Sequence, residues 1–150
     1  MAGRSRARTR AAAALVPAAG VAILALGTGT ASAAFVQDEA EFTYTSTFGE
    51  KVTCLVASTN EFEPALDDVA FVSTVVSGDD ECAQSFVTIN VTYLLPGHRP
   101  ASGSAGGFGE AFGSFEPVAE DFRSEHLVDF LSCDLGRSDC RFEVTLVQPK

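Results

Sequence analysis

Strict alternation of apolar and polar side chains marks the clearest strand in the chain, at residues 85–95 (SFVTINVTYLL). Val87, Ile89, Val91 and Tyr93 would share one face of this strand, while the threonines and Asn90 would share the other. A period of two is typical of a β-strand with one buried face. Residues 69–77 (VAFVSTVVS) are rich in β-branched side chains and short for a helix, so a strand is predicted there too.

Two hairpins are predicted from the same alternation. Residues 41–48 and 51–57 alternate on either side of a turn at Gly49, and residues 124–147 contain two alternating runs around a polar loop with Gly136. Period-two runs separated by a short loop that contains glycine are typical of a β-hairpin. The second hairpin has a cysteine at each end of its loop.

The remaining stretches predict irregular structure. Residues 58–68 contain Pro64 and favour a loop, with one possible helical turn over 64–68 because proline suits a first helical position. Residues 96–107 are rich in Pro, Gly, Ser and Ala and predict the longest loop, and residues 110–118 predict a short irregular strand. About seven strands without a clear helix favour an antiparallel β-sandwich of immunoglobulin-like architecture. A small closed β-barrel is the alternative.

The first 33 residues have the pattern of a secretory signal peptide. Four arginines precede an apolar run over residues 11–26, and Ala31-Ser32-Ala33 supplies the small residues of a cleavage site. The run is short for a membrane span and is interrupted by Pro17 and Gly20. We therefore expect cleavage near Ala33, a single domain over residues 34–150, and a secreted, extracellular protein.

The net charge of the chain limits the classes of binding partner that we expect. Six lysines and arginines remain after residue 33 against all 20 acidic residues, which leaves a formal charge of −14. A surface of this sign repels phosphate groups, so neither nucleic acid nor an anionic membrane is an expected partner.

Four cysteines in an exported chain predict two disulfides. Cys54–Cys82 with Cys133–Cys140 is the favoured pairing because each bridge links neighbouring segments. The main alternative crosses the sandwich, for example Cys54 with Cys133. No C-x-x-C motif supports a zinc or redox site, and no cofactor or metal is expected.

Catalysis has little support in the sequence. A Ser–His–Asp arrangement could use His126 and Asp129, but no nucleophile motif surrounds any serine, and alternation on a strand would point Asp129 away from His126. We expect no enzymatic activity.

Two stretches are candidate binding sites. Phe108, Phe112 and Phe115 lie in a glycine-rich segment, where they could line a ligand crevice or plug one end of the core. Arg137-Ser138, inside the Cys133–Cys140 loop, could be offered to a trypsin-like protease. A disulfide-closed loop of this kind is similar in outline to small disulfide-looped serine-protease inhibitors, although it lacks the prolines that stiffen their loops.

The sequence thus predicts a secreted, non-catalytic binding module, which we expect to be a monomer. Its ligand would be an extracellular protein or a small apolar molecule bound near residues 96–115. Two other functions stay open: a serine-protease inhibitor that acts through the Cys133–Cys140 loop, and a structural or interaction protein of the cell envelope.

Overall fold

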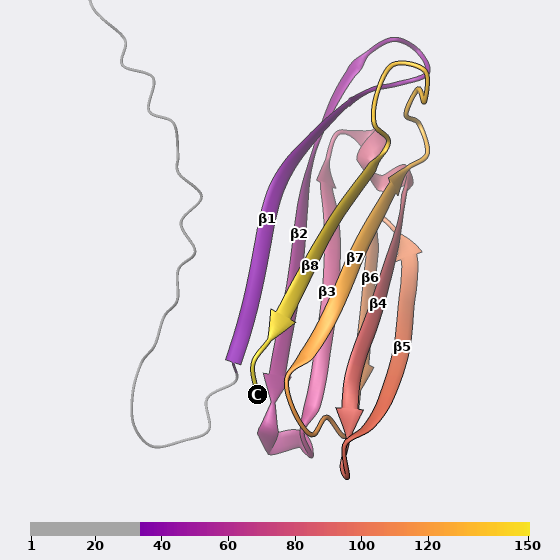
Figure 1. The fold of residues 1–150 in the computed structure, drawn as a ribbon. Helices are drawn as coiled ribbons and strands as arrows, with labels where there is room; N and C mark the ends of the chain where they lie inside the picture. Colours follow the sequence, from indigo (N-terminus) through magenta and orange to yellow (C-terminus); the bar gives the residue numbers. More distant parts are fainter. Residues whose placement is uncertain (1–33) are drawn as a thin grey trace, which may run out of the picture.

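Two antiparallel four-stranded sheets pack face to face in the computed structural model, which describes residues 34–150 (Figure 1). The first sheet has the order β1-β2-β3-β6 and the second β5-β4-β7-β8. The strands are β1 (Ala34–Thr45), β2 (Lys51–Glu63), β3 (Val69–Gly78), β4 (Ser85–Leu95), β5 (Arg99–Phe108), β6 (Glu110–Phe115), β7 (Phe122–Phe130) and β8 (Arg141–Gln148). Short 3₁₀ helices occupy Pro64–Leu66 and Asp80–Gln84. The predicted two-disulfide sandwich is confirmed, and the alternative of a closed barrel is not formed.

The connectivity explains how the two layers are built. β1, β2 and β3 form a meander in the first sheet, β4 and β5 form a hairpin in the second, and the chain then returns to the first sheet as β6. In an immunoglobulin domain the second strand lies beside the fifth, whereas here β2 lies beside β3. The chain crosses between the layers at Gly109, whose positive φ of 69° suits a glycine.

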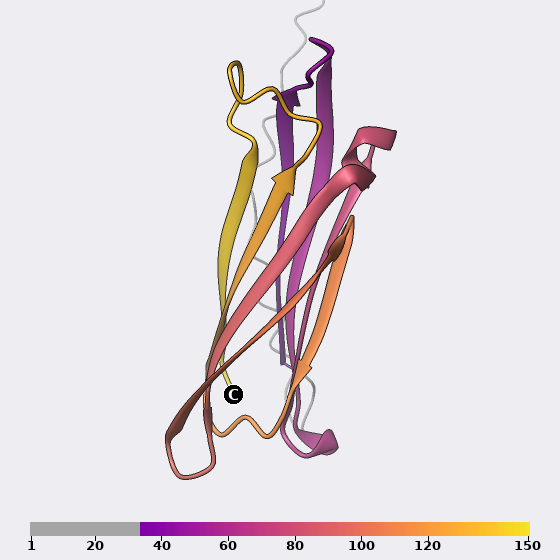
Figure 2. The same ribbon diagram turned by 90° about the vertical axis from the view of Figure 1, so that its right-hand side faces the viewer.

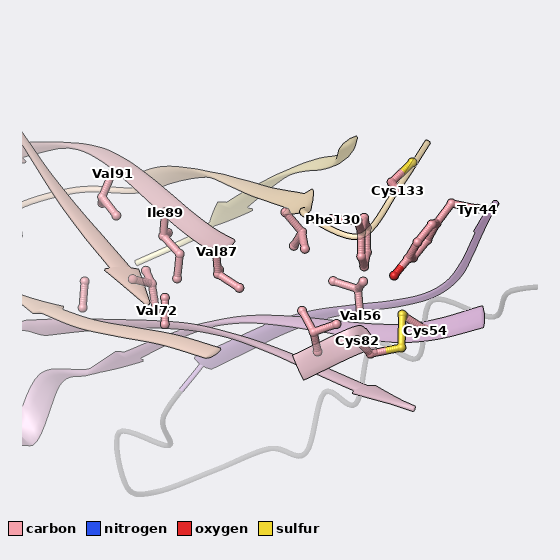
Figure 3. Packing of buried hydrophobic residues seen from close by; sticks show 14 of the residues in the cluster. Tyr44, Cys54, Val56, Val72, Cys82, Val87, Ile89, Val91, Phe130 and Cys133 are labelled. Carbon is pink, nitrogen blue, oxygen red and sulfur yellow. A yellow bond between two sulfur atoms is a disulfide. The ribbon is translucent and has the colours of Figure 1, made fainter. Parts of the chain in front are cut away.

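Alternating burial positions the core between the sheets. Val87, Ile89 and Val91 of β4 are fully buried, and they face Val56 and Val72 of the first sheet (Figure 3). Each such side chain contributes about 1.5–3 kcal/mol when it is removed from water. Aromatic rings fill one end of this core, where Phe42 stacks on Phe130 with ring centroids 4.7 Å apart and Tyr44 lies beside them. The strongest part of the sequence pattern therefore forms the centre of the sandwich.

The predicted loop at residues 96–107 is wrong, because most of it forms β5. Arg99–Phe108 pairs with β4 along its whole length. Its inward positions carry only alanine and glycine, since the sheets come close together here. A Cβ on Gly103 would lie 2.2 Å from Cε1 of Phe115. The strand therefore shows no apolar alternation, although it is fully paired.

The predicted loop at residues 58–68 is also wrong over its first half. β2 continues to Glu63 and pairs with β1 on one side and β3 on the other. Ser58 and Asn60 occupy inward positions and are fully buried, so the apolar pattern stops before the strand does. The helical turn is confirmed at Pro64–Leu66, and β1 begins at Ala34, before the predicted start at residue 41.

Both predicted disulfides are formed. Cys54 of β2 is bonded to Cys82, with Cα atoms 5.7 Å apart, and Cys133 to Cys140, with Cα atoms 5.6 Å apart. The alternative that crosses the sandwich is wrong. Within residues 34–150 no helix is long and apolar enough to span a membrane, and the expected signal peptide at residues 1–33 lies outside the described residues.

Candidate functional site

The three candidate phenylalanines are not brought together. Phe108 lies on the outer face of the second sheet, where its ring makes an edge contact with Phe86 at 5.2 Å. Phe112 is on the outer face of the first sheet, 6.0 Å from the ring of Phe71. Only Phe115 faces inward and packs on Tyr93 at 5.8 Å. Of the two interpretations, the end plug fits Phe115 alone, and no crevice is formed by all three.

A groove does lie in the segment that the sequence singled out, at the hairpin end of β4 and β5. It is shallow and largely open to solvent, has a volume of about 720 Å³, and is lined by residues of β4, β5, β7 and β8. In Figure 2 this hairpin curves away from the first sheet at the lower left. We call this feature the hairpin groove. It is defined by Thr92, Leu94, Pro100, Ser102, Arg123 and Val147, and Asp121 adds one carboxylate to its lining.

Strand register explains how these residues meet. Thr92 is the partner of Ser102 on β5 and of Arg123 on β7, and Arg123 is in turn the partner of Val147 on β8. Side chains in register on one face of a sheet are neighbours. One row of four side chains therefore crosses the whole outer face of the second sheet, and the paired Leu94 and Pro100 extend it toward the hairpin turn.

The chemistry of the hairpin groove is amphipathic. Leu94, Pro100 and Val147 supply apolar surface, and Val147 is 55 % exposed. The guanidinium of Arg123 has one ionic partner among residues 34–150, Glu125, at 3.4 Å. A guanidinium has five N–H donors, so most of them face the groove or solvent. Sequence reasoning missed Arg123 and Val147, because only the register across the sheet brings them beside the hairpin.

A second group of polar side chains lies inside the core, around the fully buried His126 of β7. His126 Nδ1 is 2.7 Å from the hydroxyl of Thr74 on β3, and Nε2 is 2.6 Å from the hydroxyl of Ser124. Thr74 lies 3.2 Å from the hydroxyl of Ser58, and Ser124 donates to Asn60 Oδ1 at 2.7 Å. These five residues, which we call the buried polar cluster, join the two sheets through side-chain hydrogen bonds.

With the Asn60 amide oriented so that Oδ1 faces Ser124, which leaves Nδ2 buried without a partner among residues 34–150, one proton arrangement is consistent with these contacts. Ser124 uses its proton on Asn60, so it must accept from His126, and the ring proton is therefore on Nε2. Nδ1 then accepts from Thr74, which in turn accepts from Ser58. The ring is neutral, and burial lowers the pKa of His126 to about 4.

The buried polar cluster has the connectivity of a nucleophile and a base, but it is sealed. Ser58, Asn60, Thr74, Ser124 and His126 each have no exposed surface. Asp129, the carboxylate that a triad would need, is on the opposite face of β7, as the alternation predicts. The signal that could have revealed this cluster is the presence of polar residues at inward positions of otherwise apolar strands.

The candidate inhibitor loop forms a compact turn. The N–H groups of Arg137 and Ser138 both donate to the Asp134 carbonyl, at 2.9 and 3.0 Å. The Arg137 guanidinium pairs with the Asp134 carboxylate at 3.3 Å, and the Ser138 hydroxyl accepts the N–H of Thr45 at 2.7 Å. The Arg137–Ser138 bond is thus held in a hydrogen-bonded turn and is not extended. Inhibition stays a prediction, and a failure to inhibit trypsin-like proteases at micromolar protein would contradict it.

Metal ligands do not gather in the part of the chain that the structure describes, where no three His, Cys, Asp or Glu residues could hold an ion together. No protein-family model matches the sequence, and no match was found among curated proteins or solved structures. The candidate site therefore depends on its own geometry.

Proposed function

We propose that this protein is an exported, non-catalytic β-sandwich that binds a small ligand in the hairpin groove. The ligand class that fits is a molecule with an apolar body and one anionic group. The observation that supports this proposal is the row formed by Ser102, Thr92, Arg123 and Val147, which places a cation beside apolar walls and two hydroxyls.

Charge gives Arg123 a particular importance in this proposal. The chain after residue 33 carries a formal charge of −14, so an anion would be repelled from most of its surface. A guanidinium presents its donors in a planar fork that matches the oxygens of a carboxylate or similar anion. Leu94 and Pro100 would cover the apolar part of the same molecule, because small-molecule sites combine apolar walls with a few polar groups.

Export is proposed from the signal-like residues 1–33 and from the disulfides, which persist in oxidising compartments. The proposal of a non-catalytic function is supported by the sealed position of His126, whose ring has no exposed surface. Mass spectrometry of unreduced protein from the culture medium should give the mass of a chain that begins near Ala34, less four hydrogens. A retained N-terminus would contradict cleavage.

Ligand binding can be tested with the fluorescent probe 1-anilinonaphthalene-8-sulfonate, which has an apolar body and one sulfonate. We expect saturable binding at pH 7 by the folded protein. Val147→Asp should weaken it about tenfold or more by placing an anion in the apolar wall, which corresponds to about 1.4 kcal/mol. Arg123→Gln should weaken it as well.

The matched control is Val75→Asp, on the outer face of the first sheet, where Val75 is 45 % exposed. This variant adds the same charge at a similar exposure but outside the hairpin groove, and it should bind the probe as the unaltered protein does. Equal binding by Val147→Asp and the unaltered protein would contradict the proposed site.

A further inference from the structure

The sandwich has four edge strands among the described residues, β1, β6, β5 and β8. An edge strand leaves one row of backbone N–H and C=O groups unpaired, and native proteins protect such rows with charge, proline or short length. Three edges are protected in this way. β6 has only six residues, and the other two carry charged side chains along their length: Asp38, Glu39 and Glu41 on β1, and Arg141 and Glu143 on β8.

β5 is the least protected of these four edges, because its charge and its proline, Arg99 and Pro100, both lie at its start. It has ten residues, and no charged side chain occurs between Ala101 and Phe108. Its outward side chains are small, apart from Pro100 and Phe108, so few side chains cover this edge, and β6 lies against the strand near Gly107. The whole segment 85–109, which contains β4 and β5, has no acidic residue in a chain that carries 20 of them. The edge strand with the longest uncharged stretch therefore belongs to a hairpin that has no acidic residue.

The backbone groups on the open side of β5 can be identified from the ladder. Gly109 N donates to Ser85 O at 2.9 Å, which makes that pair a hydrogen-bonded one. Bonded and non-bonded pairs alternate in an antiparallel ladder. Following the register along β5, Ser102, Ser104, Gly106 and Phe108 direct their N–H and C=O groups away from β4. Pro100 falls in the same series; its missing N–H costs no bond to β4 but leaves one bond fewer for a strand that pairs with the open side.

We propose that β5 pairs antiparallel with β5 of a second copy, so that the two second sheets become one continuous eight-stranded sheet. A two-fold axis satisfies both edges at once, because each copy offers the same row of groups. The inference concerns backbone groups at a strand edge and does not rest on the ligand proposed above.

Charge favours a second copy as the occupant of this edge. Two chains with a formal charge of −14 repel each other, and the repulsion is smallest where the acidic residues are furthest away. Antiparallel pairing also places the start of β5 in one copy beside the end of β5 in the other. Arg99 at the start of β5 comes beside the Glu110 end of the second copy, and the same contact occurs twice.

Apolar side chains select the register of this pairing. Several registers pair the outward N–H and C=O groups of the two β5 strands. The register with Ser104 on the two-fold axis overlaps the two strands most fully, because Ser104 lies near the middle of β5. It places Pro100 opposite Phe108 of the second copy, on the outer face of the sheet. Phe108 is 68 % exposed in the single chain, so this contact would cover one of its largest exposed rings.

Sedimentation equilibrium of the disulfide-bonded protein 34–150, from low micromolar to several hundred micromolar, tests the proposal. We expect a reversible monomer–dimer equilibrium. Ser104→Lys and Ser104→Glu should each be monomeric, because like charges would face each other across the axis. An equimolar mixture of the two variants should recover the dimer, because the charges are then opposite.

The matched control is Asn90→Lys, since Asn90 is the β4 partner of Ser104 on the same face but one strand away from the edge. This variant should dimerise as the unaltered protein does. Hydrogen exchange of the unaltered protein supplies a measurement that needs no variant. At high concentration the amides of Ser102, Ser104, Gly106 and Phe108 should become protected.

Three results would overturn the proposal. The first is a monomer at every concentration with rapid exchange at these amides. The second is a dimer that persists in both Ser104 variants, which would place the interface elsewhere. The third is a mixture of the folded variants that stays monomeric, which would exclude a two-fold axis at Ser104.

Discussion

His126 carries no charge in the folded protein, because its ring lies between two hydroxyls in a site without exposed surface. The hydrogen bond of Nδ1 to Thr74 crosses from the second sheet to the first. A buried polar group is stabilising only when it is fully partnered. The imidazole therefore links the layers as long as it stays neutral, and its protonation state is coupled to the stability of the sandwich.

The first prediction is that stability falls as the pH falls from about 6.5 to about 4. Burial lowers the pKa of His126 to about 4 from 6.5, so the unfolded chain takes up a proton first. The stabilisation from the neutral ring is fully present above pH 6.5 and is lost progressively on acidification; the loss amounts to about 3 kcal/mol at pH 4. Urea unfolding at pH 7.5, 6.0 and 5.0 would measure it. His126→Gln removes this titration and should show a flatter dependence, so identical slopes would contradict the explanation.

The packing against Phe115 requires a glycine at position 103. A Cβ at this position would lie 2.2 Å from Cε1 of Phe115, closer than atoms can pack. Gly103→Ala should therefore destabilise the protein by about 1–3 kcal/mol, the usual effect of overpacking, in urea unfolding. The double variant with Phe115→Ala provides the control, because the added methyl group then has space. A strictly additive pair would show that the two residues do not meet.

At the scale of elements, the sequence predicts best those strands whose inward positions are bulky and apolar. β4 and the β7–β8 hairpin were identified because Val, Ile and Phe alternate there with polar residues. β5 was missed because Phe115 occupies the space that its own inward side chains would fill. The second half of β2 was missed because Ser58 and Asn60 face the interior. Their hydrogen-bond partners, Thr74 for Ser58 and Ser124 and His126 for Asn60, lie on other strands.

The two disulfides close loops of different length, so their loss should have different effects. The bridges span 28 residues (Cys54–Cys82) and 7 residues (Cys133–Cys140). Loop-closure entropy gives about 3.5 kcal/mol for the longer loop and about 2.5 kcal/mol for the shorter. Paired Cys→Ala variants measured by urea unfolding should follow this order. A larger loss for the short bridge would mean that contacts of the β7–β8 connection, and not chain entropy, dominate.

For the whole molecule, the sequence indicated the segment that holds the candidate site but not its residues. Residues 96–115 were singled out for their phenylalanines, yet the groove uses Pro100 and Ser102 together with Arg123 and Val147. These side chains meet only because β5, β4, β7 and β8 lie in that order in one sheet. Neither the strand order nor the register can be obtained from local alternation, since both depend on how the chain crosses between the layers.

Net charge decides how the proposed pairing of two copies should respond to salt. Each chain carries a formal charge of −14 after residue 33, so association opposes a long-range repulsion that salt screens. The screening length falls from about 10 Å at 0.1 M to about 3 Å at 1 M. The dimer held by β5 should therefore become tighter as sodium chloride is raised over this range. Sedimentation equilibrium at constant pH measures the dimerisation constant. A dimer that weakens with salt would contradict this, since the two approaches of Arg99 to the Glu110 end would then outweigh the net repulsion.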